Sequence, residues 1–136
     1  MTEPDTSALR TFAQDWFDAL SHRAPVEQLL GFVVDDGLRM AFPEGTLLSH
    51  ADVEDWYAAV GRIYTDQTHT IERFLAVPTE SGTDVTVTVV WTARQLADDE
   101  RLAFRVDQAW KLTAGGPDGK QRIADYQVGT LTPIPV

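Results

Sequence analysis

The feature that most constrains the fold is a series of long strand patterns in the second half of the chain. Residues 85–95 alternate valine with threonine for most of their length, as in a β-strand with one buried face. Similar strand patterns cover residues 68–77, 102–112 and 122–131, and short polar turns separate them, the last at residues 115–119. Strands joined by short turns pair with their sequence neighbours, so an antiparallel meander is predicted.

Helices are predicted mainly in the first half. Apolar residues recur at three- and four-residue steps over residues 9–20, which predicts an amphipathic helix. A second, short helix is expected to begin at Pro25, because proline suits the first helical position. Ser49 and Asp52 are spaced as in a capping box and predict the start of a third helix. Residues 38–42 alternate as a short strand. The third helix is expected to bury a face formed by Val53, Trp56, Tyr57, Val60 and Tyr64.

This order predicts an α+β fold of the type ααβαββββ, in which a cone-shaped, curved antiparallel sheet wraps around the N-terminal helices. Long strands twist and therefore curl. A curled sheet closed on one side by helices leaves a hollow with an open mouth. The inward positions that we expect are Val85, Val87, Val89, Trp91, Phe104, Val106, Gln108, Trp110, Leu112, Ile123, Asp125 and Gln127.

Composition limits the domain count and the class of partner. A length of 136 residues suits one domain, which we expect to span residues 1–136 with an ordered core over about 6–132. The net charge of −10 disfavours nucleic acid and anionic membranes. No apolar run reaches the roughly 18 residues of a membrane span, and the N-terminus does not resemble a secretory signal. Cysteine is absent, which excludes thiolate metal sites. A cytoplasmic protein is therefore expected.

The chain resembles the nuclear transport factor 2-like superfamily, and within it the SnoaL-like (polyketide-cyclase-like) group. The resemblance covers nearly the whole chain and rests on the segments AQDWFDAL, VVDDGLRMAFPEG, QTHTIERFLAV, VTVVWTAR, VDQAWKLT and RIADYQVG. It implies the cone-shaped fold, but the superfamily contains both enzymes and binding proteins. Its ketosteroid isomerases use an aspartate base with a tyrosine and a protonated aspartate. Phe42, Trp16 and Gln108 stand at the matching positions, so that isomerase chemistry is not expected.

Two further enzyme groups of the superfamily share fragments with the chain. Limonene-epoxide hydrolases contain an Arg-x-Asp and an Asp-Tyr, which Arg105-Val106-Asp107 and Asp125-Tyr126 resemble. The parity of their strand predicts that Arg105 and Asp107 face outward, which disfavours this chemistry. Scytalone-type dehydratases carry a strand histidine that His69 matches, although Trp16-Phe17 replaces their helix-one Tyr-Asp pair.

His69 is the first candidate for acid–base chemistry, because only histidine changes charge near neutral pH without assistance. Its direction is ambiguous in the sequence, since His69 and Ile71 share a parity that Phe74 does not. A β-bulge near Glu72-Arg73 would place all three on the inner face. The alternative is a structural histidine.

Asp125 is the second catalytic candidate, because an inward carboxylate is costly to bury unless it is paired or functional. The alternative is an ion pair with Arg94 or Arg122, or exposure near the strand end. The ligand-binding wall is expected to comprise Trp16, Phe42, Tyr57, Tyr64, Trp91, Gln108 and Trp110.

These expectations favour a domain that binds a small, mostly hydrophobic molecule, with cofactor-free acid–base catalysis of the dehydratase, isomerase or cyclase type. No cofactor or metal site is expected, because the three histidines are widely spaced. The alternative is a non-catalytic binding or assembly module whose pocket is filled by its own aromatic residues. A homodimer is expected through the outer sheet face, where Thr86, Thr88, Val90 and Thr92 point outward.

Overall fold

The computed structural model describes residues 6–114 and 120–135, so the turn predicted at 115–119 lies outside the described residues. The elements are α1 (Thr6–Ser21), α2 (Val26–Leu30), β1 (Arg39–Phe42), β2 (Gly45–Leu47), α3 (His50–Ile63), β3 (Tyr64–Thr79), β4 (Gly82–Gln95), β5 (Arg101–Thr113) and β6 (Arg122–Pro133). None of the described helices is long and apolar enough to span a membrane.

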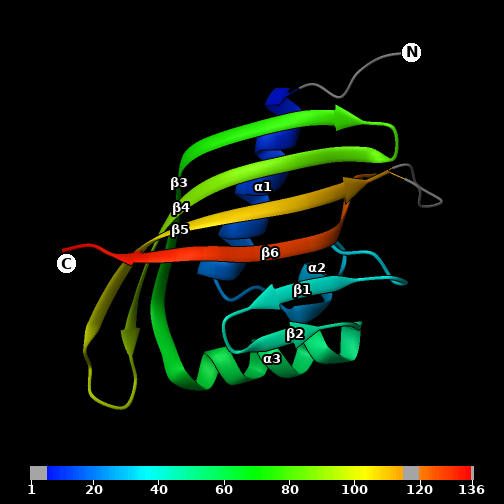
Figure 1. Cartoon of the computed structure of the whole chain (residues 1–136). Coiled ribbons are helices and arrows are strands. Elements are labelled where there is room, and N and C mark those ends of the chain that lie inside the picture. The colour runs from blue at the N-terminus through cyan, green and yellow to red at the C-terminus, as the bar shows by residue number, and fades with distance from the viewer. Residues whose placement is uncertain (1–5, 115–119, 136) are drawn as a thin grey trace.

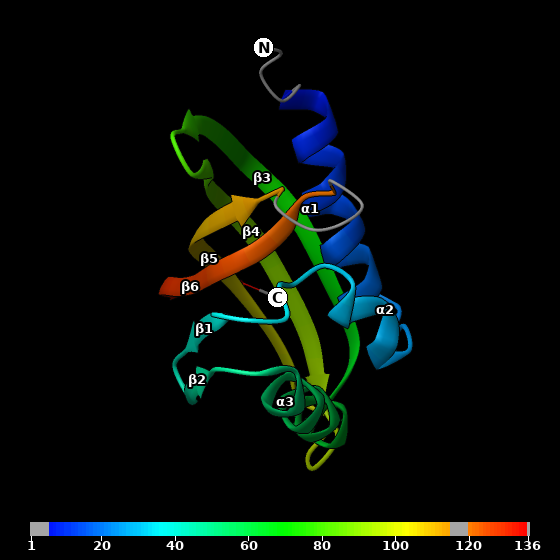
Figure 2. The ribbon, with the colours of Figure 1, turned by 90° about the vertical axis from the view of Figure 1, so that its right-hand side faces the viewer.

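The strands form one curved sheet in the order β2-β1-β6-β5-β4-β3. Strands β3 to β6 pair antiparallel in sequence order, which confirms the predicted meander. Figure 1 shows these four strands as long bent ribbons, with α1 behind them and α3 across one end. Figure 2 shows from the side that α1 lies along the concave face and α3 closes its lower end. The α+β cone expected from the sequence is therefore confirmed.

Two features of the sheet differ from the prediction. β1 runs parallel to β6, which makes the sheet mixed rather than purely antiparallel. The short strand β2, absent from the predicted order, pairs antiparallel with β1. β2 has only three residues, which are exposed or half-buried, so it carries no alternating pattern.

The ends of two helices follow from local sequence. The hydroxyl of Ser49 accepts a hydrogen bond from the backbone N–H of Asp52 at 3.2 Å, which confirms Ser49 as the cap of α3. The Asp52 carboxylate accepts one from the N–H of Leu48, at 2.9 Å. Pro25 precedes α2 as its N-cap instead of occupying its first turn. Tyr64, expected on the face of the third helix, is the first residue of β3.

Bulges determine which side chains face inward. In β3, the register with β4 shifts between Ile71 and Arg73, so Glu72 is the extra residue. His69, Ile71 and Phe74 consequently all face α1 and the core, as the predicted bulge requires. β6 also contains a bulge, which was not predicted. Lys111 pairs with Asp125 and Leu112 pairs with Ile123, so Ala124 is the extra residue.

Candidate functional site

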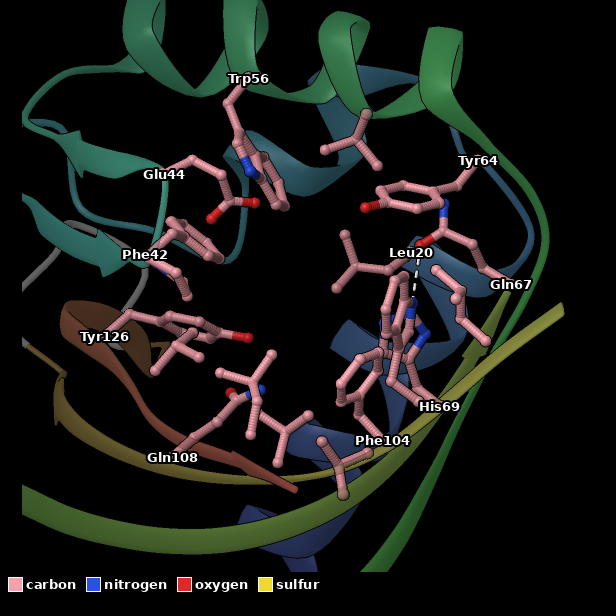
Figure 3. Close-up of a pocket in the computed structure, with 18 of the residues that line it drawn as sticks. Leu20, Phe42, Glu44, Trp56, Tyr64, Gln67, His69, Phe104, Gln108 and Tyr126 are labelled. Carbon is pink, nitrogen blue, oxygen red and sulfur yellow. Dashed lines mark hydrogen bonds between the residues drawn. The ribbon is translucent and has the colours of Figure 1, made fainter. Parts of the chain in front are cut away.

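A cavity of about 430 Å³ lies between α3 and the concave face of the sheet, and it is partly open to solvent. Figure 3 shows its aromatic and polar side chains converging from α3, the β1–β2 turn and the long strands. The wall is mostly apolar, as in small-molecule sites. Its polar or ionisable members are Glu44, Tyr57, Tyr64, Gln67, His69, Gln95, Gln108 and Tyr126, and its apolar members include Phe42, Trp56, Trp91 and Phe104.

His69 lines this cavity from β3, opposite Trp91 in the strand register. Its Nδ1 lies 2.9 Å from the hydroxyl oxygen of Ser21, the last residue of α1. The ring of Phe17 stacks on the imidazole with a centroid separation of 5.5 Å. Burial lowers the pKa of His69 to about 4, and the nearby charge of Asp18 opposes this shift only partly. His69 is therefore neutral at neutral pH.

Tyr126 lies on β6, and Figure 3 shows its hydroxyl directed into the cavity. The indole N–H of Trp16 donates to the Tyr126 oxygen at 3.4 Å. The indole N–H of Trp110 donates to the side-chain oxygen of Gln108 at 3.0 Å. Burial raises the pKa of Tyr126, and hydrogen bonding from Trp16 and Gln108 offsets only part of that rise. Tyr126 therefore stays protonated throughout the usual pH range.

A second indole–amide pair lies at the His69 end of the cavity. The N–H of Trp91 donates to the side-chain oxygen of Gln67 at 3.1 Å, and Figure 3 marks this bond. Trp91 also packs edge-on against Tyr64 and stacks with Phe104, with centroid separations of 5.1 Å and 6.1 Å. Hydrogen bonding and ring packing thus hold this wall in one arrangement.

Tyr57 lines the cavity through its ring, because its hydroxyl is already engaged. The hydroxyl donates to the carbonyl oxygen of Ala24 at 2.6 Å, and the guanidinium of Arg23 lies 3.9 Å from the ring centroid. Tyr57 thus belongs to the ligand-binding wall, as expected from the sequence, but its hydroxyl is not free to donate to a ligand. Tyr64 remains a lining tyrosine, although it comes from β3 rather than from α3.

Glu44 lies in the turn between β1 and β2, and Figure 3 shows its carboxylate directed toward the cavity beside Phe42 and Trp56. The two rings stack with centroids 4.6 Å apart. A carboxylate at this position disfavours anionic ligands, in line with the net charge of −10. Phe42 was expected in the wall and Trp56 on the buried face of the third helix, and both line the cavity, whereas Glu44 is a lining residue that the sequence did not indicate.

Two tryptophans expected in the ligand-binding wall lie behind it. Trp16 is fully buried and Trp110 is 2% exposed, and neither lines the cavity. Trp110 stacks on Tyr126 with centroids 5.2 Å apart, while Trp16 meets the same ring edge-on. Their part in the site is to support Tyr126 and Gln108. Trp91, Phe42 and Gln108 line the cavity as expected.

The expectation that Asp125 points inward is wrong. The bulge in β6 reverses the parity after Ile123, so Tyr126 takes the inward position and Asp125 turns away from the cavity. The Asp125 side chain is 24% exposed and lies 3.9 Å from Arg39, neither of the two arginines proposed as partners. Gln127 is exposed for the same reason. His69 and Asp125 therefore do not share the site, and Tyr126 is a further lining residue that was not expected from the sequence.

Among residues 6–114 and 120–135, no group of three or more histidine, aspartate or glutamate side chains is arranged to hold a metal ion. The polar atoms of the cavity are an imidazole, amides, hydroxyls and one carboxylate. Such a set can bind oxygen and nitrogen atoms of a neutral molecule and can transfer a proton at His69.

No protein-family model matches the chain. No curated protein matches it by sequence either. Solved structures do match its fold. A nuclear transport factor 2-like superfamily protein from Salmonella enterica serovar Typhimurium superposes with a TM-score of 0.80 at 11% identity, covering 91% of this chain and 89% of its own.

Two other matches have names that include an activity. Hexachlorocyclohexane dehydrochlorinase LinA-type3 from Novosphingobium barchaimii LL02 gives a TM-score of 0.79 at 13% identity, with coverage of 94% and 88%. A ketosteroid isomerase-like protein from Erwinia carotovora atroseptica gives 0.76 at 15% identity, with coverage of 99% and 100%. The chain therefore has the fold of the nuclear transport factor 2-like superfamily.

Proposed function

We propose that the chain binds a small, mostly hydrophobic, neutral molecule in the cavity and that His69 acts on it as a cofactor-free general base. One observation carries this proposal. A neutral imidazole, oriented through Nδ1 by Ser21, lines the same largely apolar cavity as the hydroxyl of Tyr126. No described residue is hydrogen-bonded to Nε2 of His69, so this nitrogen is available to a ligand.

The lowered pKa of His69 defines the chemistry that such a base supports. At neutral pH the imidazole is unprotonated and can accept a proton, but a group with a pKa of about 4 is a weak base. It suits a C–H bond that is already acidified by a neighbouring carbonyl or leaving group. Elimination and isomerisation are reactions of this kind. The names of two structural neighbours, a dehydrochlorinase and an isomerase-like protein, agree with this class.

Binding is tested by thermal unfolding with a panel of neutral one- and two-ring compounds. A ligand that binds only the folded state at 100 times its Kd stabilises it by about 2.7 kcal/mol, which raises Tm by several degrees. Val60→Trp should abolish the shift, because Val60 is a half-buried lining residue of α3. Ala58→Trp is the matched control, since Ala58 lies on the exposed face of the same helix. Equal shifts in the two variants would contradict binding in this cavity.

Proton abstraction is tested by deuterium exchange in D₂O at the carbon next to the carbonyl of a bound cyclic ketone, followed by ¹H NMR. The wild-type protein should accelerate exchange over buffer, and His69→Gln should remove the acceleration while the ketone still binds. Equal exchange in wild type and His69→Gln would contradict the role of His69 as base and would leave the binding proposal standing.

The alternative, a non-catalytic module filled by its own aromatic residues, is weakened by the positions of the indoles. Trp16 and Trp110 lie in the core behind the cavity instead of inside it. A homodimer through the outer sheet face is compatible with either function. Sedimentation equilibrium of wild type and a Thr86→Arg variant tests this interface.

A further inference from the structure

The hydrogen bonds around Tyr126 leave its hydroxyl with a single role. Trp16 donates to the Tyr126 oxygen through its indole N–H, and an indole nitrogen can only donate. The Gln108 amide also acts on this hydroxyl and lowers the Tyr126 pKa against the effect of burial. The orientation of that amide is fixed from its other side, because Trp110 donates to the Gln108 oxygen at 3.0 Å. The Tyr126 oxygen therefore accepts from Trp16, which leaves its hydroxyl proton as the group available for donation.

The proton of the Tyr126 hydroxyl has no acceptor among the described residues, although the residue is only 2% exposed. Buried tyrosine hydroxyls usually find a hydrogen-bond partner. Figure 3 shows the hydroxyl at the cavity surface, on the wall opposite His69. The raised pKa keeps the proton in place at neutral pH. The hydroxyl is therefore placed to donate a hydrogen bond into the cavity.

We propose that the Tyr126 hydroxyl is a dedicated hydrogen-bond donor that selects ligands with a carbonyl oxygen, and that Trp16 and Gln108 position it for this purpose. The substrate class is then a neutral ketone or aldehyde with a one- or two-ring apolar body. This inference deepens the proposed function and rests on it for the location of the ligand. A site built around a fixed donor rejects analogues that lack the acceptor, because the buried donor is then left unpaired.

The test compares 1-tetralone with tetralin, which has the same ring system without the oxygen. Wild-type protein labelled with ¹³C at Cζ of tyrosine should show a change in the Tyr126 resonance with 1-tetralone and little change with tetralin. Tyr126→Phe should weaken 1-tetralone binding by about tenfold, the value of one buried hydrogen bond, and leave tetralin binding unchanged. The carbonyl stretch of bound ¹³C-labelled 1-tetralone should move to higher frequency in the variant.

Tyr64→Phe is the matched control, because Tyr64 also lines the cavity but receives no indole hydrogen bond in the described residues. Its effect on 1-tetralone binding should be small. Equal losses for both ligands in Tyr126→Phe, or a larger loss in Tyr64→Phe, would overturn the role of Tyr126 and leave apolar binding intact. Failure of both compounds to bind the wild-type protein would count against the proposed function itself. The labelled wild-type experiment decides the question even where a variant folds poorly.

Discussion

The hydroxyl of Ser21 lies 2.9 Å from Nδ1 of His69 and joins the end of α1 to β3. Phe17, one turn earlier on the same helix, stacks on the imidazole ring. Helix α1 thus contacts both the edge and the face of His69. The ring is oriented by residues that are close in sequence to each other but 48 or more positions from His69 itself.

His69 should make stability depend on pH in a specific window. Its pKa is about 4 in the folded protein and about 6.5 in the unfolded chain, so the unfolded state binds more protons between these values. The contribution of the neutral buried ring is fully present above pH 6.5. As the pH falls, this contribution to the free energy of unfolding decreases, and the total loss is roughly 3 kcal/mol once the pH is below 4. Urea unfolding between pH 7.5 and 4.5 measures this loss.

The His69→Gln variant separates His69 from the many carboxylates, which titrate in both proteins. The variant should lose about 2–3 kcal/mol less than wild type between pH 7.5 and 4.5. Identical pH profiles, or an NMR titration of His69 near pH 6.5, would show that the ring is not buried as described.

Ser21→Ala removes the hydroxyl partner of Nδ1 and should leave the fold intact, because Ser21 is only half-buried. Loss of this hydrogen bond is expected to cost about 1 kcal/mol of stability. It should also change the ring-nitrogen ¹⁵N shifts of His69, which report the tautomer. Unchanged ¹⁵N shifts would mean that Ser21 does not orient the ring.

Gln108→Leu should destabilise the protein by about 1–3 kcal/mol, because it leaves the buried N–H of Trp110 without its acceptor. Gln127→Leu is a suitable control on the neighbouring strand, since Gln127 is exposed and a change within about 0.5 kcal/mol is expected. Chemical unfolding measures both. Equal effects of the two substitutions would contradict the buried Trp110–Gln108 pair.

Deleting Glu72 tests the bulge that places His69 in the cavity. Without the extra residue, Ile71 and Phe74 can no longer both face inward, so one of them must turn outward together with the residues on its side of the bulge. Exposing apolar side chains of this size costs about 2 kcal/mol each or more in stability. The deletion should therefore strongly lower Tm. Glu72→Ala keeps the backbone and removes only an exposed ion pair with Arg105, so its Tm should stay close to wild type. A deletion variant as stable as Glu72→Ala would show that the register is not fixed in this way.

The sequence predicts the fold well because most of its elements are long and periodic. The bulge in β3 was predictable, since Ile71 and Phe74 are apolar at opposite parities. The same signal exists in β6, where the apolar residues Ile123, Tyr126 and Val128 change parity, and it reveals Tyr126 once it is applied there. If the parity of Ile123 is continued without this change, Asp125 takes the inward position, which is the expectation that the structure contradicts.

Other features depend on contacts between distant segments. The parallel pairing of β1 with β6 brings Met40 beside Tyr126, and no local pattern indicates it. The burial of Trp16 and Trp110 behind the cavity depends on contacts between α1 and the sheet, such as that of Phe17 with Trp110. Likewise, the engagement of the Tyr57 hydroxyl by Ala24 requires the chain path between α1 and α2.

The most direct test of a ligand-binding cavity uses three of the four tryptophans as internal reporters. Trp56 and Trp91 line the cavity, whereas Trp110 lies in the core behind it. Titration with a neutral two-ring compound, followed through the indole ¹⁵N–¹H resonances, should give saturable shifts for Trp56 and Trp91 and a much smaller shift for Trp110. An absence of saturable shifts at Trp56 and Trp91 across the panel would contradict the account.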